Sequence, residues 1–343
     1  MSGSEKILFM RRLSLFLHAG MPLMHALDLM KGESARQARV RMHASLIADI
    51  LDGRKLSAAL ARFPRAFDLL ALSLVRAGES SGSLPQQLEN IALLLERRKE
   101  GCERMIRVAL YPAVLSCMAI GLTFFLTLYV FPKMLPLFSG FHRQLPIATR
   151  ILIALTAFLS EYGAASAAGL ILLLVSALFS LRYRRIRRRF EQALLAVPIA
   201  GPIIRYRSTA FITHTLSTLL ESGLGILPAL GVLSSYTRAV LYTDALTAIE
   251  AHIREGRPIA DAFSAQARLF PPVAAQLIRA GEYTGTLPEG LRHVSDICEH
   301  YLKERSARLE TLAEPVLMIV LGFMIGFVAL AIITPIYGIT QSL

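Results

Sequence analysis

The chain contains three long stretches with no charged residue and no histidine. These stretches cover 108–131, 162–181 and 315–343. A helix that crosses a bilayer needs about 20 mostly apolar residues, because the hydrocarbon core is about 30 Å thick and each residue rises about 1.5 Å. We therefore expect three membrane-spanning helices, at 108–131, 162–181 and 315–336.

Outside these stretches the apolar residues follow the spacing of amphipathic helices. Phe9, Leu13, Phe16 and Leu17 lie three or four residues apart and would share one helix face. Strand-like alternation is scarce. The pattern therefore predicts an all-α fold, a polytopic membrane protein in which helical domains alternate with the spans.

The two halves of the chain repeat each other. The motif Arg76–Glu79, Arg-Ala-Gly-Glu, returns as Arg279–Glu282, at an offset of 203 residues. The same offset aligns further turn-forming residues, namely Gly20 with Gly223, Gly53 with Gly256, Gly82 with Gly285, Pro85 with Pro288, Pro112 with Pro315 and Pro132 with Pro335. Glycines and prolines at a constant offset indicate a shared backbone geometry. We interpret 1–107 and 182–314 as two copies of one helical domain.

Turn residues predict where the helices of each copy end and restart. Gly20 and Gly223 are typical of helix ends. Gly78 and Gly281 are assigned to the left-handed position after a helix, and each is followed by a capping box. The capping boxes are Ser83-Leu84-Pro85-Gln86 and Thr286-Leu287-Pro288-Glu289. No strong breaker follows, so the last helix of each copy is predicted to run on into the span, bending at Pro112 or Pro315.

Composition and charge bear on the membrane interpretation. The chain is 54% hydrophobic with a mean hydropathy of +0.51, and its net charge is +12. Arginines and lysines concentrate just before the first stretch and just after the second, in the cluster 182–189. By the positive-inside rule the N-terminus and both helical domains are cytoplasmic, and the loop 132–161 and the tail 337–343 are extracytoplasmic.

Candidate chemistry is sparse. We find no nucleophile elbow, no phosphate-binding loop and no set of metal ligands with suitable spacing, so we expect no enzyme activity, no cofactor and no metal. Cys102, Cys117 and Cys298 do not suggest a disulfide framework. The arginine cluster lacks interleaved aromatics, which argues against nucleic acid and favours an anchor that faces anionic membrane lipid.

The repeated turns are the candidate contact sites. Their residues are Arg76, Gly78, Glu79, Gly82, Arg279, Gly281, Glu282 and Gly285. Two interpretations of the glutamates remain open: each either fixes its turn through backbone hydrogen bonds or the arginine one turn back, or belongs to a docking edge for a cytoplasmic partner. Gly322 and Gly326, four residues apart in the third stretch, suit close helix packing.

The duplicated domain, the glycines above and two nine-residue motifs point to a known family. The motifs are Arg-Ala-Gly-Glu-Ser-Ser-Gly-Ser-Leu at 76–84 and Arg-Ala-Gly-Glu-Tyr-Thr-Gly-Thr-Leu at 279–287. On these features the chain resembles the type II secretion F protein family. The resemblance covers nearly the whole chain. It implies six-helix cytoplasmic bundles and a homo-oligomeric platform in the bacterial inner membrane. It also implies that the platform couples a secretion or pilus assembly ATPase to pilin or pseudopilin extraction, alongside other inner-membrane assembly proteins.

A membrane transporter or channel is the alternative function. Three spans and a repeated architecture are compatible with it. Transport pathways usually place ionisable groups at membrane depth, however, and the three uncharged stretches contain none. The sequence therefore favours a platform over a transporter, and does not decide between a type IV pilus, a type II secretion and a DNA-uptake machine.

Overall fold

The computed structural model describes residues 3–32, 37–125 and 183–340, together with isolated positions between 129 and 180. Within these residues the chain forms helices joined by turns, with no strand. The predicted all-α fold is confirmed. Most of the predicted loop 132–161, half of the second predicted span 162–181, most of residues 126–131 at the end of the first span and the last three residues of the predicted tail 337–343 lie outside the described residues.

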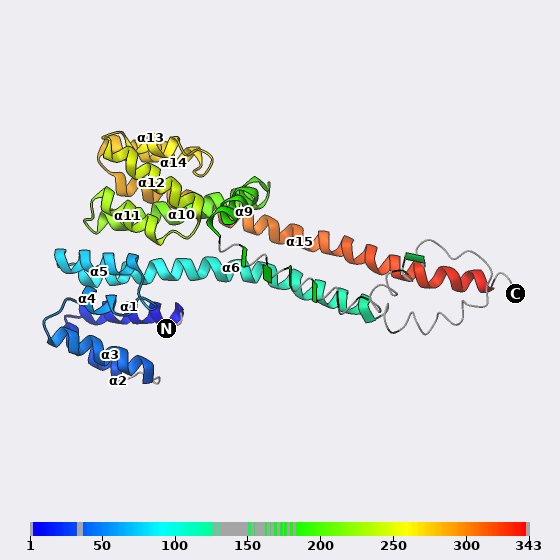
Figure 1. The fold of residues 1–343 in the computed structure, drawn as a ribbon, viewed down its shortest axis with the longest axis horizontal. Helices are drawn as coiled ribbons and strands as arrows, with labels where there is room; N and C mark the ends of the chain where they lie inside the picture. The colour runs from blue at the N-terminus through cyan, green and yellow to red at the C-terminus, as the bar shows by residue number, and fades with distance from the viewer. Residues whose placement is uncertain are drawn as a thin grey trace. The chain divides into compact units, whose positions relative to one another are not determined.

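Within the described residues the first copy contributes six helices, which Figure 1 labels. They are α1 (Gly3–His18), α2 (Leu23–Gly32), α3 (Gln37–Leu51), α4 (Leu56–Ala61), α5 (Leu69–Ser81) and α6 (Leu84–Phe125). The apolar stripe predicted for the first helix is confirmed, because Phe9 and Leu13 are buried while Phe16 and Leu17 pack against the core. We call residues 3–103 the first bundle.

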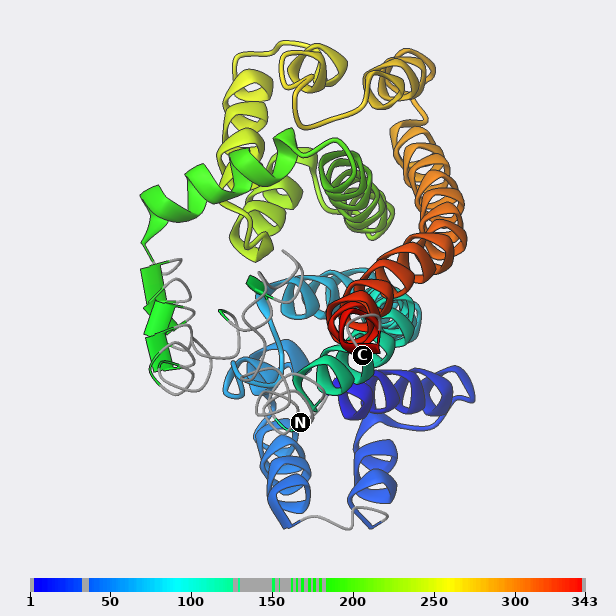
Figure 2. The ribbon, with the colours of Figure 1, turned by 90° about the vertical axis from the view of Figure 1, so that its right-hand side faces the viewer.

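Within the second predicted domain, 182–314, the helices that repeat the first copy are preceded by one further helix, α9 (Arg184–Ala196). The helices of the second copy are α10 (Ala200–Glu221), α11 (Ile226–Tyr236), α12 (Val240–Arg254), α13 (Ile259–Ser264), α14 (Pro272–Thr284) and α15 (Leu287–Thr340). In Figure 2 helices α10 to α14, coloured from green to light orange, lie together with the first part of α15. We call residues 200–304 the second bundle.

The duplication predicted from the sequence is present in the backbone. Helices α4 and α5 return as α13 and α14 at the offset of 203 residues, and α6 and α15 begin 203 residues apart. Among the described residues, the positive φ values belong to six glycines, Gly20, Gly53, Gly82, Gly223, Gly256 and Gly285, which form three pairs at this offset. Gly20 and Gly223 end their helices as predicted, with φ of 79° and 86°.

Equivalent residues fill the two cores. Leu13 and Leu216 are both fully buried, and so are Leu88 and Leu291, each pair 203 residues apart. The serine directly after each of Leu13 and Leu216 joins the first helix of its bundle to the last. Ser14 Oγ donates to the carbonyl of Pro85 over 2.8 Å, and Ser217 Oγ donates to that of Pro288 over 2.8 Å. The first and last helices therefore pack against each other in the same way in both copies.

Contacts divide the chain into two compact units. One joins residues 1–103 to 187–304 and so contains both bundles; the other joins 104–186 to 305–343. Helices α6 and α15 run without a break through Pro112 and Pro315, as predicted. Among the described residues, no helix meets the length and apolarity that a membrane crossing requires.

Candidate functional site

Each repeated turn joins two antiparallel helices through one left-handed glycine. Gly82, with φ of 72°, links α5 to α6, and Gly285, with φ of 75°, links α14 to α15. The hydroxyls on either side of each glycine lie 2.7 Å apart, Ser81 with Ser83 and Thr284 with Thr286. The predicted helix starts after Ser83 and Thr286 are confirmed.

The assignment of Gly78 and Gly281 to the left-handed position is wrong. Both glycines lie inside their helices and are buried, and the helices continue for three further residues to Ser81 and Thr284. A Cβ at Gly78 would lie 2.9 Å from Leu84 Cα, and one at Gly281 would lie 2.9 Å from the Thr286 carbonyl oxygen. These glycines therefore serve the close approach of two helices, not the turn itself.

Glu79 and Glu282 hold the start of a short helix in their own copy. The Glu282 carboxylate accepts from the backbone N–H of Ile259 over 2.8 Å and of Ala260 over 3.1 Å, at the N-terminus of α13. Glu79 accepts from the N–H of Ser57 over 3.1 Å and from its hydroxyl over 2.5 Å, at the N-terminus of α4. A carboxylate is favoured there because the first N–H groups of a helix have no intrahelical partner.

The two arginines of the motif are not equivalent. Arg279 Nη2 donates to Asp261 Oδ1 over 2.7 Å, and both side chains are more than half exposed. In the first copy Ala58 occupies the position of Asp261, and Arg76 is exposed. The arginine one turn back therefore does not pair with the glutamate in the second copy, and such exposed pairs contribute at most about 1 kcal/mol.

The turn of the second bundle carries an aromatic side chain that the sequence analysis did not single out. Tyr283 is 93% exposed, directly after the helix-capping Glu282, and Ser80 stands at its place in the first copy. Exposed tyrosines are enriched where proteins meet one another. The sequence does contain a signal for this difference, because the first motif has Glu-Ser-Ser where the second has Glu-Tyr-Thr.

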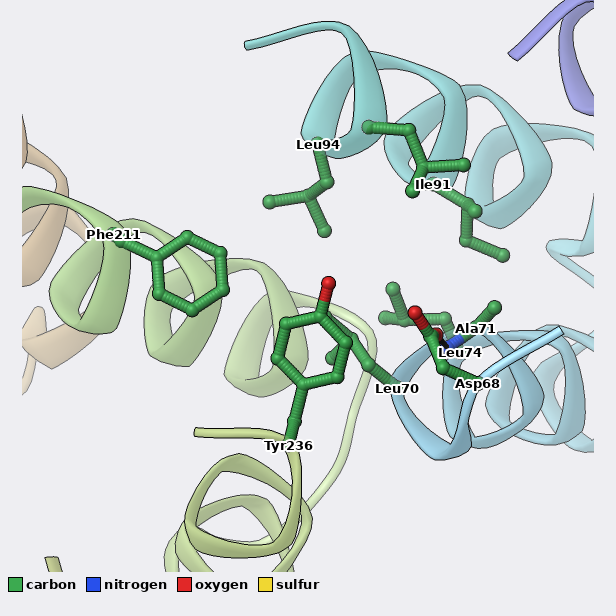
Figure 3. A pocket seen from close by; sticks show the side chains of 9 residues that line it. Asp68, Leu70, Ala71, Leu74, Ile91, Leu94, Phe211 and Tyr236 are labelled. Atoms are coloured by element: carbon green, nitrogen blue, oxygen red, sulfur yellow. Dashed lines mark hydrogen bonds between the residues drawn. The ribbon is translucent and has the colours of Figure 1, made fainter. Parts of the chain in front are cut away.

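A contact between the bundles was also absent from the sequence analysis. Helices α5 and α11 pack together, and a small pocket between the bundles is lined by Asp68, Leu70, Ala71, Leu74, Ile91, Leu94, Leu95, Phe211 and Tyr236 (Figure 3). Tyr236 stacks on Phe211 with ring centroids 5.7 Å apart, and its hydroxyl accepts a hydrogen bond from Arg98. Burial raises the pKa of Tyr236, with a further upward contribution from Asp68.

A second contact joins the two long helices. Arg97 Nη1 of α6 lies 3.2 Å from Glu299 Oε1 of α15. Close to Arg97 lies His214 of α10, and burial lowers the pKa of His214 to about 4, with Arg97 and Arg292 acting in the same direction. The junction between the bundles therefore holds a neutral histidine next to arginines.

The described residues offer little for catalysis or metal binding. No three of their His, Cys, Asp or Glu side chains lie close enough together to hold a metal ion. The buried carboxylate of Asp49 is neutralised by Arg62, whose Nη1 lies 2.7 and 2.8 Å from its two oxygens. Burial raises the pKa of the Cys298 thiol to about 12, which makes it a poor nucleophile.

Gly322 and Gly326 lie in α15, and a Cβ built at either would meet no described atom within 4 Å. Their role in helix packing stays a prediction. The described residues define a helical scaffold in which one bundle is used twice. Each copy has the same glycine turn and the same glutamate latch, by which we mean the carboxylate of Glu79 or Glu282 bound to the first residues of the short helix α4 or α13.

Comparison with known proteins identifies the family. The chain belongs to the family of type II secretion system protein F, whose model matches it twice, over residues 9–132 and 212–335. These matches are also offset by 203 residues at both ends, which confirms the internal repeat. The chain is therefore a non-enzymatic member of the secretion and pilus assembly machinery.

Relatives from both kinds of machine resemble the chain over almost its whole length. It is 32% identical to a type 4 fimbrial assembly protein PilC of Pseudomonas putida over 330 residues, which cover 96% of this chain and 82% of the relative. It is 28% identical over 341 residues to the type IV pilus assembly protein PilC of Myxococcus xanthus, covering 99% and 82%. It is 28% identical over 341 residues to the type II secretion system protein F of Pseudomonas aeruginosa, covering 99% and 84%.

Proposed function

We propose that the chain is a platform in the bacterial inner membrane that couples a cytoplasmic assembly ATPase to the extraction of pilin or pseudopilin subunits and to filament assembly. The observation that carries the proposal is the family domain used twice, each copy closed by a helix that continues far beyond its bundle. A bundle on a long helix suits the transmission of a movement.

The proposed topology has three spans, at 108–131, 162–181 and 315–336. The uncharged stretches support them, and the flanking arginines favour a cytoplasmic location for 1–107 and 182–314, together with the N-terminus. The loop 132–161 and the tail 337–343 are then extracytoplasmic. Both bundles face the side on which ATP is available.

The proposed contacts of the platform follow from this arrangement. The turns at 76–82 and 279–285 form docking edges for the ATPase or for other inner-membrane assembly proteins, and the exposed Tyr283 supports this assignment for the second copy. Gly322 and Gly326 permit helix packing within a homo-oligomer. The docking edge does not rely on the two glutamates, since both are already engaged in their own bundle.

Affinity purification of the tagged full chain from native membranes tests the proposal. We expect a secretion-type ATPase and a pilin-like protein to be recovered together with untagged copies of the chain. Their reproducible absence would contradict the platform function. Selective solute flux into vesicles reconstituted with the purified chain would instead favour a transporter or channel.

A further inference from the structure

Helix α9 carries an open apolar stripe on its outer face. Ile186, Phe190 and Ala193, with Val197 directly after the helix, follow one another at steps of four, three and four residues, so they share one side. All four are exposed, Ile186 to 44% and Phe190 to 49%. An exposed stripe of this kind on a highly basic helix needs an explanation.

The opposite side of α9 is already in use. The Glu191 carboxylate accepts from the N–H groups of Val240 and Leu241, over 3.1 and 3.0 Å, and so holds the start of α12. Arg188 lies 3.7 Å from Asp244 of the same helix. Figure 2 shows α9, in green, running alongside the second bundle. These contacts fix which side of α9 faces outward.

Two arginines border the stripe, and neither has an ion-pair partner among the described residues. Arg185 and Arg189 lie one turn apart on the outer side, next to Ile186 and Phe190, and both are exposed. Neither forms an ion pair with another described residue, whereas Arg187 and Arg188 are paired with Glu191 and Asp244. The open side of α9 thus combines two free positive charges with apolar side chains.

We propose that α9 lies flat in the headgroup layer of an anionic membrane. Ile186, Phe190 and Val197 enter the boundary of the acyl chains, and Arg185 and Arg189 bind lipid phosphate oxygens. The proposal rests on the proposed membrane location, because α9 begins three residues after the proposed second span. The apolar stripe favours lipid over nucleic acid, which offers such side chains no apolar surface on its backbone.

A fluorescent probe on the stripe tests this site. The full chain, with Cys102 and Cys117 replaced by serine and the buried Cys298 retained, carries Ala193→Cys labelled with an environment-sensitive fluorophore. It is reconstituted into vesicles of phosphatidylcholine alone or mixed with phosphatidylglycerol. We expect blue-shifted emission in the anionic vesicles and a much smaller shift in the neutral ones. The same label at Gln192→Cys, exposed but off the stripe, should show water-like emission in both.

Charge variants test whether binding to anionic lipid requires Arg185 and Arg189 or only the positive charge of the chain. Arg185→Gln with Arg189→Gln should abolish the difference between anionic and neutral vesicles. Arg238→Gln with Arg268→Gln removes the same charge from exposed positions elsewhere and should preserve the difference. Equal emission in both lipids, in a chain that resists alkaline carbonate extraction, would overturn the lipid site and leave the platform function standing. Release of the chain by carbonate would overturn both.

Discussion

At the scale of single residues, the duplication has kept backbone geometry more strictly than side chains. Gly53 and Gly256 have φ of 77° and 76°. The buried carboxylate of Asp49 pairs with the half-exposed Arg62, four residues before and nine after Gly53. This ion pair has no counterpart, because His252 and Ala265 stand at those places in the second copy. The turn that requires glycine is thus retained where the ion pair is replaced, which agrees with the small net stability that such pairs often contribute.

Gly281→Ala should destabilise the second bundle by about 1–3 kcal/mol, because its Cβ would lie 2.9 Å from the Thr286 carbonyl oxygen and the backbone would have to move. Denaturant unfolding of the purified chain measures the change. Gly231→Ala in α11 is the matched control: its Cβ meets nothing within 4 Å, so it should be neutral or stabilise by up to about 1 kcal/mol. Equal effects of both variants would contradict the close-packing role.

The neutral His214 should make the chain less stable in acid. Its pKa of about 4 in the folded chain lies below the ordinary value of 6.5, so the unfolded chain binds the proton first as the pH falls. Stability contributed by this group is complete above about pH 6.5 and is lost progressively down to about pH 4. Thermal unfolding of His214→Gln and wild type at pH 7 and pH 5 should show a smaller loss in the variant.

The exposed histidine His293 provides the control for this experiment. His293→Gln removes an imidazole from the surface of the same bundle, and we expect it to keep the pH dependence of the wild type. An unchanged pH dependence in His214→Gln would show that other groups cause the acid sensitivity.

Tyr283→Ala should weaken recovery of the ATPase without weakening the fold. A side chain that is 93% exposed loses little packing on truncation, so the free energy of unfolding should change by less than about 0.5 kcal/mol. Ser80→Ala at the equivalent place in the first copy is the control for both measurements. Wild-type recovery of the ATPase with Tyr283→Ala would remove the second turn from the proposed docking edge.

At the scale of helices, the sequence predicts the repeating plan well and tertiary contacts poorly. Gly20 and Gly223 mark helix ends because few other residues adopt the left-handed conformation. Each motif has a second glycine four residues after the first, at 82 and 285, and the sequence does not say which of the two ends the helix. The choice depends on the distance to the following helix, which is a tertiary property. The stacking of Tyr236 on Phe211 was unpredictable for the same reason.

Helix α13 should open more easily when its glutamate latch is weakened. Glu282→Gln keeps the shape but removes the charge that accepts the N–H groups of Ile259 and Ala260, at a cost of about 1 kcal/mol. Hydrogen exchange should become faster at these amides. Glu289→Gln, exposed in the first turn of α15, removes the same charge and should leave exchange in α13 unchanged. Unaltered exchange in Glu282→Gln would mean that the latch is dispensable.

At the scale of the whole molecule, the proposed topology places both bundles on one side of the membrane. Thiol labelling is a natural test, but the native Cys298 is unsuitable: it is fully buried, and burial raises its thiol pKa to about 12. A reporter on the second bundle must therefore be introduced at an exposed position.

Tyr283→Cys, with Cys102 and Cys117 replaced by serine, supplies this reporter. A membrane-impermeant maleimide should label it in inverted membrane vesicles and not in intact cells. A cysteine at the proposed extracytoplasmic tail, Ser342→Cys, should show the reverse. Labelling of Tyr283→Cys from outside intact cells would refute the proposed orientation of the second bundle.

The six left-handed glycines also determine how freely the sequence can change. The two copies share one backbone conformation but differ in their side chains. In a saturation mutagenesis survey, the tolerance to substitution should therefore be low at positions 20, 53 and 82 and equally low at the positions 203 residues later. The tolerance of the two copies should diverge at 49 and 252, where the second copy has a histidine in place of the ion-paired Asp49. Each bundle has its own glutamate latch, so an intact copy would not compensate for a damaged one, and the repetition provides no genetic redundancy.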